Sequence, residues 1–112
     1  MASPQIEGGF TRISHELLET YLLVSRNLSP YENTLWWAIV RKTYGFKKKT
    51  DWISNSQLTK LTGILGPHII RTKKKLLAYH MIVKKGREIG IQKDWEKWCI
   101  PYKGKIDRKS VV

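Results

Sequence analysis

The sequence predicts a mainly helical α+β fold, a winged helix-turn-helix with a C-terminal β-hairpin wing. Three observations lead to this fold class. A short helical pattern is joined by a tight turn to a second, basic helical pattern, as in a helix-turn-helix. A stretch with β-branched residues then begins a predicted hairpin. The length of 112 residues, with five tryptophans and five tyrosines, suits one domain with a modest core.

Two short flanking segments are expected around this domain. Residues 1–9 contain Pro4, Gly8 and Gly9 and little to bury, so we predict a flexible arm. The winged-helix domain is predicted over residues 10–101, and residues 102–112 form a polar, basic and flexible tail. There is no basic segment followed by an apolar run at the start, and no apolar stretch reaches membrane-spanning length. We therefore expect a soluble, intracellular protein with no membrane partner.

Capping residues and apolar spacing predict the first two helices. Ser14 is expected to cap a helix that runs to about Asn27. Pro30 begins the second helix, with Ser29 as N-cap and Glu32 completing a capping box. The buried stripes are predicted from spacings of three and four residues. They are Leu17, Leu18, Tyr21, Leu22 and Val24, then Leu35, Trp36, Ile39 and Val40.

The helix-turn-helix follows a lysine-rich loop. Gly45 is the expected end of the second helix, and a short strand is expected around Trp52 and Ile53. Ser54 and Gln57 form a second capping box. The helix that they open is predicted to end at Gly63.

Pro67 is predicted to start the basic helix, which should end near Tyr79 or His80. The wing is then predicted as a strand over residues 81–85, a long loop over residues 86–94 and a returning strand over residues 95–101. Cys99 has no CxxC partner, so we expect a buried structural thiol.

The charge is strongly polarised along the chain. The net charge is +12, but residues 1–40 hold two basic and four acidic side chains, whereas residues 41–112 hold nineteen basic and five acidic ones. Such a domain presents a basic surface, for which phosphate backbones are natural partners. A nuclease needs clustered carboxylates to bind its metal ion, whereas the nine acidic residues of this chain are scattered. We therefore expect no enzymatic activity, no bound metal and no cofactor.

A helical projection at about 100° per residue separates the lysines of the basic helix. Lys73 falls inside the apolar arc that Ile69, Ile70, Leu76 and Leu77 form, so its stem should pack against the domain. Arg71 lies opposite the core, and Lys74 and Lys75 flank it. The first turns of such a helix reach base edges. His68 and Arg71 are therefore the predicted base contacts, and Lys74 and Lys75 the predicted phosphate contacts. A merely solvated basic face, with His68 as a bystander, is the alternative.

Other basic residues are candidates for the DNA backbone, although solvated lysines explain them equally well. In the loop they are Lys47, Lys48 and Lys49, and in the wing Lys84, Lys85, Arg87 and Lys93. Trp36, Trp37, Trp52, Trp95 and Trp98 are assigned to core and hairpin packing rather than to base stacking.

Three motifs resemble a known family. They are "FTRISHELLE" (10–19), "RKTYGFKKKTDWISNSQLTKLTG" (41–63) and "WEKWCIP" (95–101). Together they resemble the N-terminal domain of the lambdoid phage replication initiators, the protein O family. The residues Arg41–Gly45 match the motif that ends the family's second helix, and Ser56–Leu58 match the start of its first helix-turn-helix helix.

The resemblance implies a winged-helix domain that binds double-stranded DNA at repeated sequences of a phage or prophage replication origin, commonly as a homodimer. It also implies the cytoplasm of a bacterial host. Family members recruit the host helicase through a loader with a C-terminal region, which we expect to lie outside this chain. The residues Ile64–Pro67 depart from the family's polar or proline start of the recognition helix, so the resemblance implies no target sequence.

Two other functions use the same features. A winged-helix transcriptional repressor of phage or prophage genes reads DNA in the same way, and only the location of its sites, in an origin or a promoter, separates it from an initiator. A protein-interaction module would instead use the hairpin or the acidic first helix, and indifference to DNA at low salt would indicate it.

Overall fold

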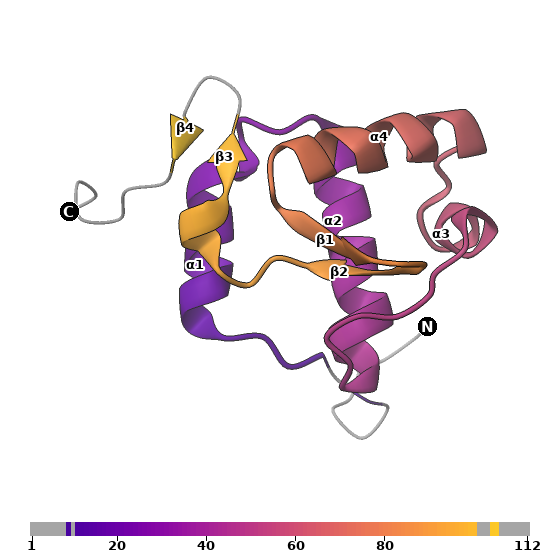
Figure 1. The fold of residues 1–112 in the computed structure, drawn as a ribbon, viewed down its shortest axis with the longest axis horizontal. Coiled ribbons are helices and arrows are strands. Elements are labelled where there is room, and N and C mark those ends of the chain that lie inside the picture. Colours follow the sequence, from indigo (N-terminus) through magenta and orange to yellow (C-terminus); the bar gives the residue numbers. More distant parts are fainter. Residues whose placement is uncertain (1–8, 10, 101–103, 106–112) are drawn as a thin grey trace, which may run out of the picture.

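A computed structural model describes residue 9, residues 11–100 and residues 104–105 of the chain. Within them, helices precede a small antiparallel hairpin, which confirms the predicted mainly helical α+β class (Figure 1). The helices are α1 (His15–Ser25), α2 (Pro30–Thr43), α3 (Asn55–Thr62) and α4 (Gly66–Ala78), with the short 3-10 helices η2 (Tyr44–Phe46) and η3 (Trp95–Lys97). The strands are β1 (Ile82–Lys85), β2 (Glu88–Ile91), β3 (Cys99–Ile100) and β4 (Gly104–Lys105). The rest of the predicted arm and tail lies outside the described residues.

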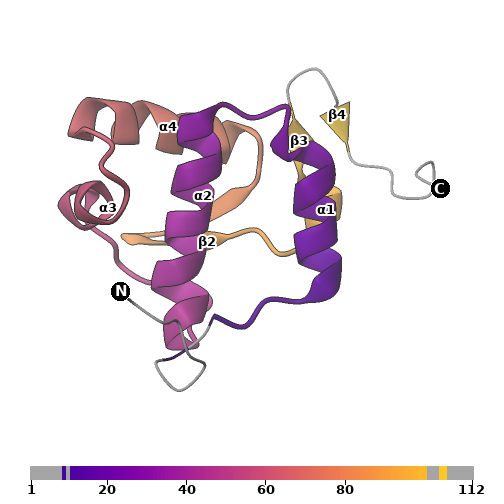
Figure 2. The same cartoon turned by 180° about the vertical axis from the view of Figure 1, so that it is seen from behind.

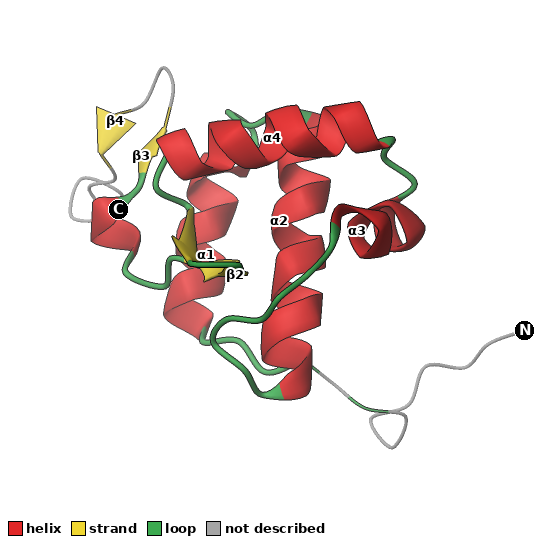
Figure 3. Cartoon of the chain, turned by 45° about the vertical axis from the view of Figure 1, so that its right-hand side comes forward, coloured by secondary structure: helices red, strands yellow, loops and turns green. Residues whose placement is uncertain are grey.

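The helices surround one core in the arrangement of a winged helix-turn-helix. α1 and α2 run side by side in opposite directions (Figure 2). α4 lies across the N-terminal end of α2, and α3 stands beside α2 (Figure 3). The β1–β2 hairpin follows α4 directly and forms the wing.

The predicted helix starts are confirmed by their caps. The hydroxyl of Ser14 accepts the Leu17 N–H at 3.2 Å. The capping boxes of Ser29 with Glu32 and of Ser54 with Gln57 are both complete. Each cap satisfies amide groups that the first turn of a helix leaves without partners. These starts therefore depend on local chemistry alone.

The predicted end of α2 at Gly45 is wrong. The chain continues through η2, and the left-handed residue is Lys47, with φ of 60°. The Lys48 N–H bonds to the Thr43 carbonyl at 2.9 Å and the Lys47 N–H to the Tyr44 carbonyl at 3.0 Å, which is the Schellman pattern. A Cβ at Gly45 would lie 2.6 Å from Arg41 Nη1, the mobile end of a long side chain, so the structure gives no strong reason for glycine at this position.

α3 and α4 agree with the prediction in position. α3 ends at Gly63, whose φ of 79° suits glycine, and Pro67 lies in the first turn of α4. α4 ends in a second Schellman motif, in which His80 takes the left-handed conformation. Ile70, which was predicted in the apolar arc, is 46% exposed. Ile69, Thr72 and Leu76 form the buried face instead.

The wing differs from the prediction in its second strand. β1 pairs with β2, from Ile82 opposite Ile91 to Lys85 opposite Glu88, so the expected loop over residues 86–94 contains the return strand. Gly86, with φ of 60°, occupies the first position of the two-residue turn, as a type II′ turn prefers. A Gly-X pair between two short alternating segments was the signal for this turn.

The predicted return strand over residues 95–101 is also wrong. Its first half is η3, and β3 pairs with β4 instead of with the wing. Cys99 is exposed, not buried, because Trp98 and Ile100 on either side of it are the residues that face the core. In α1, Leu22 is likewise exposed, although it was predicted in the buried stripe.

The core is centred on Trp36 of α2. Its ring stacks on Tyr21 of α1 at a centroid distance of 4.1 Å and meets the edge of Trp98 at 6.2 Å. Its indole N–H donates to the Met81 carbonyl at 3.3 Å. All four side chains are almost completely buried. This cluster therefore joins α1 and α2 to the α4–β1 junction and to the segment before β3.

The loop before α3 is attached to the outer edge of the wing. Asp51 and Ile89 form an antiparallel bridge with hydrogen bonds of 3.0 and 2.8 Å. This bridge replaces the strand predicted around Trp52 and Ile53. A Cβ on Gly90 would lie 2.2 Å from the Lys49 carbonyl oxygen. Only glycine permits the loop to approach β2 so closely.

We predict that Gly90→Ala destabilises the domain because the new methyl group collides with backbone that the bridge holds in place. The expected loss is about 1–3 kcal/mol of unfolding free energy, measured by chemical denaturation. Gly66→Ala is the matched control, since a Cβ at Gly66 meets nothing within 4 Å, and we expect equal or slightly higher stability. Equal stability of the two variants would contradict the packing assigned to Gly90.

Candidate nucleic-acid interface

The outer face of α4 is basic and open to solvent. Arg71, Lys74 and Lys75 are all exposed, as the helical projection predicts. α4 contains no acidic residue, so all of its charged side chains are positive. A helix with such a face can enter the major groove of a duplex.

His68 and Arg71 are brought together one turn apart on α4. Arg71 Nη2 lies 2.8 Å from His68 Nδ1. Because a guanidinium has donors only, the histidine nitrogen accepts, which requires the neutral ring with its proton on Nε2. The His68 ring also packs near Tyr31 of α2, with centroids 5.2 Å apart. Sequence reasoning missed Tyr31, which holds the histidine from the neighbouring helix.

Lys73 lies on the packing side of α4, as predicted. Its Nζ donates to Asn55 Oδ1 at 2.7 Å, so it bonds to the start of α3. Burial, and secondarily the charge of Lys84, lowers the pKa of Lys73. Lys73 therefore fixes α4 against α3 and is poorly placed to contact a partner.

A polar pocket of about 290 Å³ separates the wing from α3 and α4. Lys73 and Lys84 line it, with Gly86 and Arg87 of the wing tip on one side and Trp52 on the other. Of the exposed wing residues predicted to contact DNA, Lys85 lies on β1 outside the pocket lining, whereas Lys84 and Arg87 line this pocket with Lys73 of α4. Lys93 does not, because it lines a different pocket with Glu16, Asp94 and Glu96.

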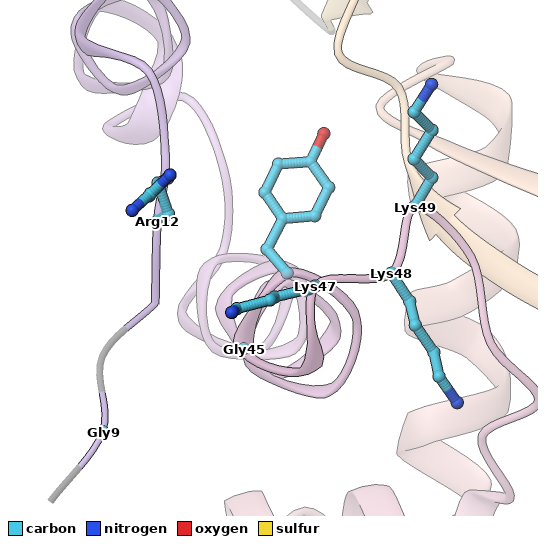
Figure 4. A pocket seen from close by; sticks show the side chains of 7 residues that line it. Gly9, Arg12, Gly45, Lys47, Lys48 and Lys49 are labelled. Carbon is cyan, nitrogen blue, oxygen red and sulfur yellow. The ribbon is translucent and has the colours of Figure 1, made fainter.

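The loop lysines form a separate basic surface. Lys47, Lys48 and Lys49 are exposed and line a pocket of about 640 Å³ with Arg12. Figure 4 shows the three lysines pointing in different directions, so one phosphate cannot contact all of them. They follow the C-terminal end of α2, whereas His68 meets Tyr31 at its N-terminal end. The 14 residues of α2 span about 21 Å.

The tryptophans divide into two groups. Trp36 and Trp98 are fully buried and Trp95 is partly buried, as predicted. Trp37 is 38% exposed and Trp52 59% exposed. The packing role predicted for Trp52 is therefore wrong, because the Asp51–Ile89 bridge turns the next side chain outward at the edge of the wing.

Within the described residues, no three His, Cys, Asp or Glu side chains are grouped closely enough to hold a metal ion. No helix there has the length and apolar character needed to cross a membrane.

In a comparison with known protein families, the model of bacteriophage replication protein O matches residues 3–98 of the chain. The chain is 33% identical to DNA replication protein gp18 of Salmonella phage P22, over 84% of this chain and 34% of that protein. It is 33% identical to replication protein O of Escherichia phage lambda, over 86% of this chain and 28% of that protein. The chain thus spans about a third of these relatives. No solved structure matches it.

The lowered pKa of Lys73 predicts a pH-dependent stability difference. Between its folded pKa and the ordinary value of 10.5, the unfolded state binds more protons, so this contribution to stability increases as the pH rises. Lys73→Met removes it while keeping the packed stem. We expect the unfolding free energy of Lys73→Met, relative to that of wild type, to be highest near neutral pH and to fall towards pH 10.5.

Denaturation at a series of pH values measures this difference. Lys74→Met, one residue along the same helix and exposed, is the matched control for the loss of a lysine charge, and the pH dependence assigned to Lys73 is read as the difference between the two variants. A pH-independent difference for Lys73→Met would contradict the burial assigned to Lys73.

Proposed function

Because this chain belongs to the bacteriophage replication protein O family, we propose that it binds double-stranded DNA sequence-specifically at repeated sites of a phage or prophage replication origin. It acts in the cytoplasm of the bacterial host, and it does so by binding rather than by catalysis. The observation that carries this proposal is Arg71, exposed on the second helix of the helix-turn-helix and oriented by His68.

The geometry of α4 supports base reading by Arg71. An arginine can donate two hydrogen bonds to the O6 and N7 edge of guanine. Such a contact is precise when the side chain is held before binding, and the His68 bond supplies that restraint. His68 keeps its Nε2–H for a base acceptor or a phosphate. Tyr31, packed on the histidine ring, then acts as a positioning residue.

Phosphate contacts supply most of the affinity in this proposal. Sequence-independent binding arises from lysine and arginine side chains that displace counterions from the DNA. Lys74 and Lys75 flank Arg71 on α4 and would clamp the strands beside the groove. The wing residues Lys84, Lys85 and Arg87 extend this surface to the neighbouring groove. The loop residues Lys47, Lys48 and Lys49 lie at the far end of α2 and contribute only if the DNA continues past the wing.

We predict that Arg71→Glu abolishes the preference for cognate sequences. Duplexes are first selected from a random pool with the wild-type chain and sequenced, and affinities for the selected and a scrambled duplex are then compared. Loss of one bidentate contact costs about 1–3 kcal/mol of discrimination. Lys74→Ala is the control, because it should weaken both duplexes equally. Unchanged discrimination by Arg71→Glu would refute α4 as the reading helix.

The selected sequences also report on assembly and on role. Direct repeats or paired half-sites would indicate binding as a homodimer. The location of matching sequences in an origin, rather than a promoter, separates replication initiation from transcriptional repression.

A second prediction concerns salt. The logarithm of the affinity should fall linearly with the logarithm of salt concentration, and each lost phosphate contact should reduce the slope by about 0.9. We expect that reduction for Lys75→Ala, measured by titrations of duplex at several salt concentrations. Lys60, an exposed lysine of α3, is the control, and Lys60→Ala should leave the slope unchanged. Equal slopes for all three proteins would contradict the phosphate contact of Lys75.

A further inference from the structure

Trp52 is presented to solvent on a rigid backbone. Its side chain is 59% exposed. Its backbone N–H, however, donates to Asp51 Oδ1 at 2.8 Å, and the backbone of Asp51 is bridged to Ile89 of the wing. No side-chain hydrogen bond or ring contact joins the indole to another described residue. The fold therefore exposes a large aromatic surface at a defined position.

A second exposed aromatic residue lies across a small pocket from Trp52. Phe46 is 55% exposed and lines, with Trp52, a pocket of about 240 Å³. The Arg41 guanidinium carbon lies 5.1 Å from the centre of the Phe46 ring. Phe46 terminates η2 and Trp52 follows the bridge, so both rings are attached to ordered backbone.

The other residues that line this pocket are mostly polar or basic. They include Lys42, Lys48 and Gln57. Asp51 also lines it, and its carboxylate lies 3.6 Å from Lys48 Nζ. This ion pair leaves the charge of Lys42 as the net positive charge of the pocket lining. Exposed aromatic rings mark binding surfaces, but protein–protein interfaces are depleted of lysine. Aromatic rings combined with cations are typical of surfaces that bind single-stranded nucleic acid, since bases stack on the rings and phosphates pair with the cations.

We propose that this aromatic pocket, formed by Lys42, Phe46, Lys48 and Trp52, binds unpaired nucleotides of single-stranded DNA. Bases stack on Trp52 and Phe46, and Lys42 and Lys48 bind the phosphates between them. This activity is separate from the duplex reading assigned to α4, and it does not require that assignment to be correct.

The position of Trp52 connects the two surfaces. Trp52 and Ile53 line both the aromatic pocket and the pocket under the wing that contains Lys73, Lys84 and Arg87. A strand that leaves a duplex bound at α4 would pass the wing tip and reach Trp52 next. This placement rests on the proposed duplex function, and it would let the same domain hold one strand beside a region where the duplex opens.

Binding of labelled oligonucleotides tests the proposal. The probes are a thymidine strand of about twelve nucleotides, within the usual size of such sites, and an abasic strand of the same length and charge. Fluorescence anisotropy should show tighter binding of the thymidine strand by the wild-type chain. Trp52→Ala should weaken thymidine-strand binding about tenfold and leave abasic-strand binding unchanged. Phe46→Ala should act in the same direction, and Trp52→Phe should retain most of the affinity.

Two controls separate this site from general effects and from the duplex site. Leu22→Ala removes an apolar side chain of α1 that is 62% exposed. It should leave the affinity for both strands unchanged. Arg71→Glu should weaken selected duplex more than Trp52→Ala does, while Trp52→Ala preferentially weakens the thymidine strand. Equal wild-type affinity for the thymidine and abasic strands would overturn the proposal. So would a Trp52→Ala protein that binds the thymidine strand as wild type does, or that loses affinity equally for both strands.

Discussion

The fold depends on one buried carbonyl group, that of Met81. It accepts the indole N–H of Trp36 at 3.3 Å and the backbone N–H of Gln92 at 2.9 Å. α2, the end of α4 and the end of the wing are therefore joined at one atom. An unpaired buried donor costs about 1–3 kcal/mol, so moving any of these segments alone is unfavourable. The angle between α4 and the wing is set at this point.

The surrounding backbone shows how that junction is formed. His80 takes a left-handed conformation that a non-glycine residue adopts at a cost of about 1–2 kcal/mol. The cost is offset by the Schellman hydrogen bonds and by burial of Met81 against Leu76. Glu32 adds a second connection, because its carboxylate caps α2 at Ser29 and accepts the Tyr79 hydroxyl at 3.1 Å. A helix cap thus also fixes the end of α4.

The high positive charge does not form one uniform surface. Lys73 is bonded inside the domain, Arg71, Lys74 and Lys75 are exposed on α4, and the loop lysines lie beyond the far end of α2. The Asp51–Ile89 bridge and the close approach at Gly90 decide how the loop meets the wing. They also turn Trp52 outward, so that an aromatic surface separates two basic ones.

Local patterns in the sequence predicted the helix starts, the order of the helices and the outer face of α4, because caps and helical periodicity are local properties of the chain. For the same reason, the helical projection placed Arg71 on the exposed face and Lys73 on the packing side. The tertiary structure decided the return strand of the wing, the exposure of Cys99 and Trp52, and the contact of Tyr31 with His68. Each of these depends on partners distant in sequence: Ile89 is opposite Asp51, and Tyr31 and His68 belong to different helices. Periodicity along one segment carries no information about which remote segment packs against it. These features therefore follow only from the tertiary packing.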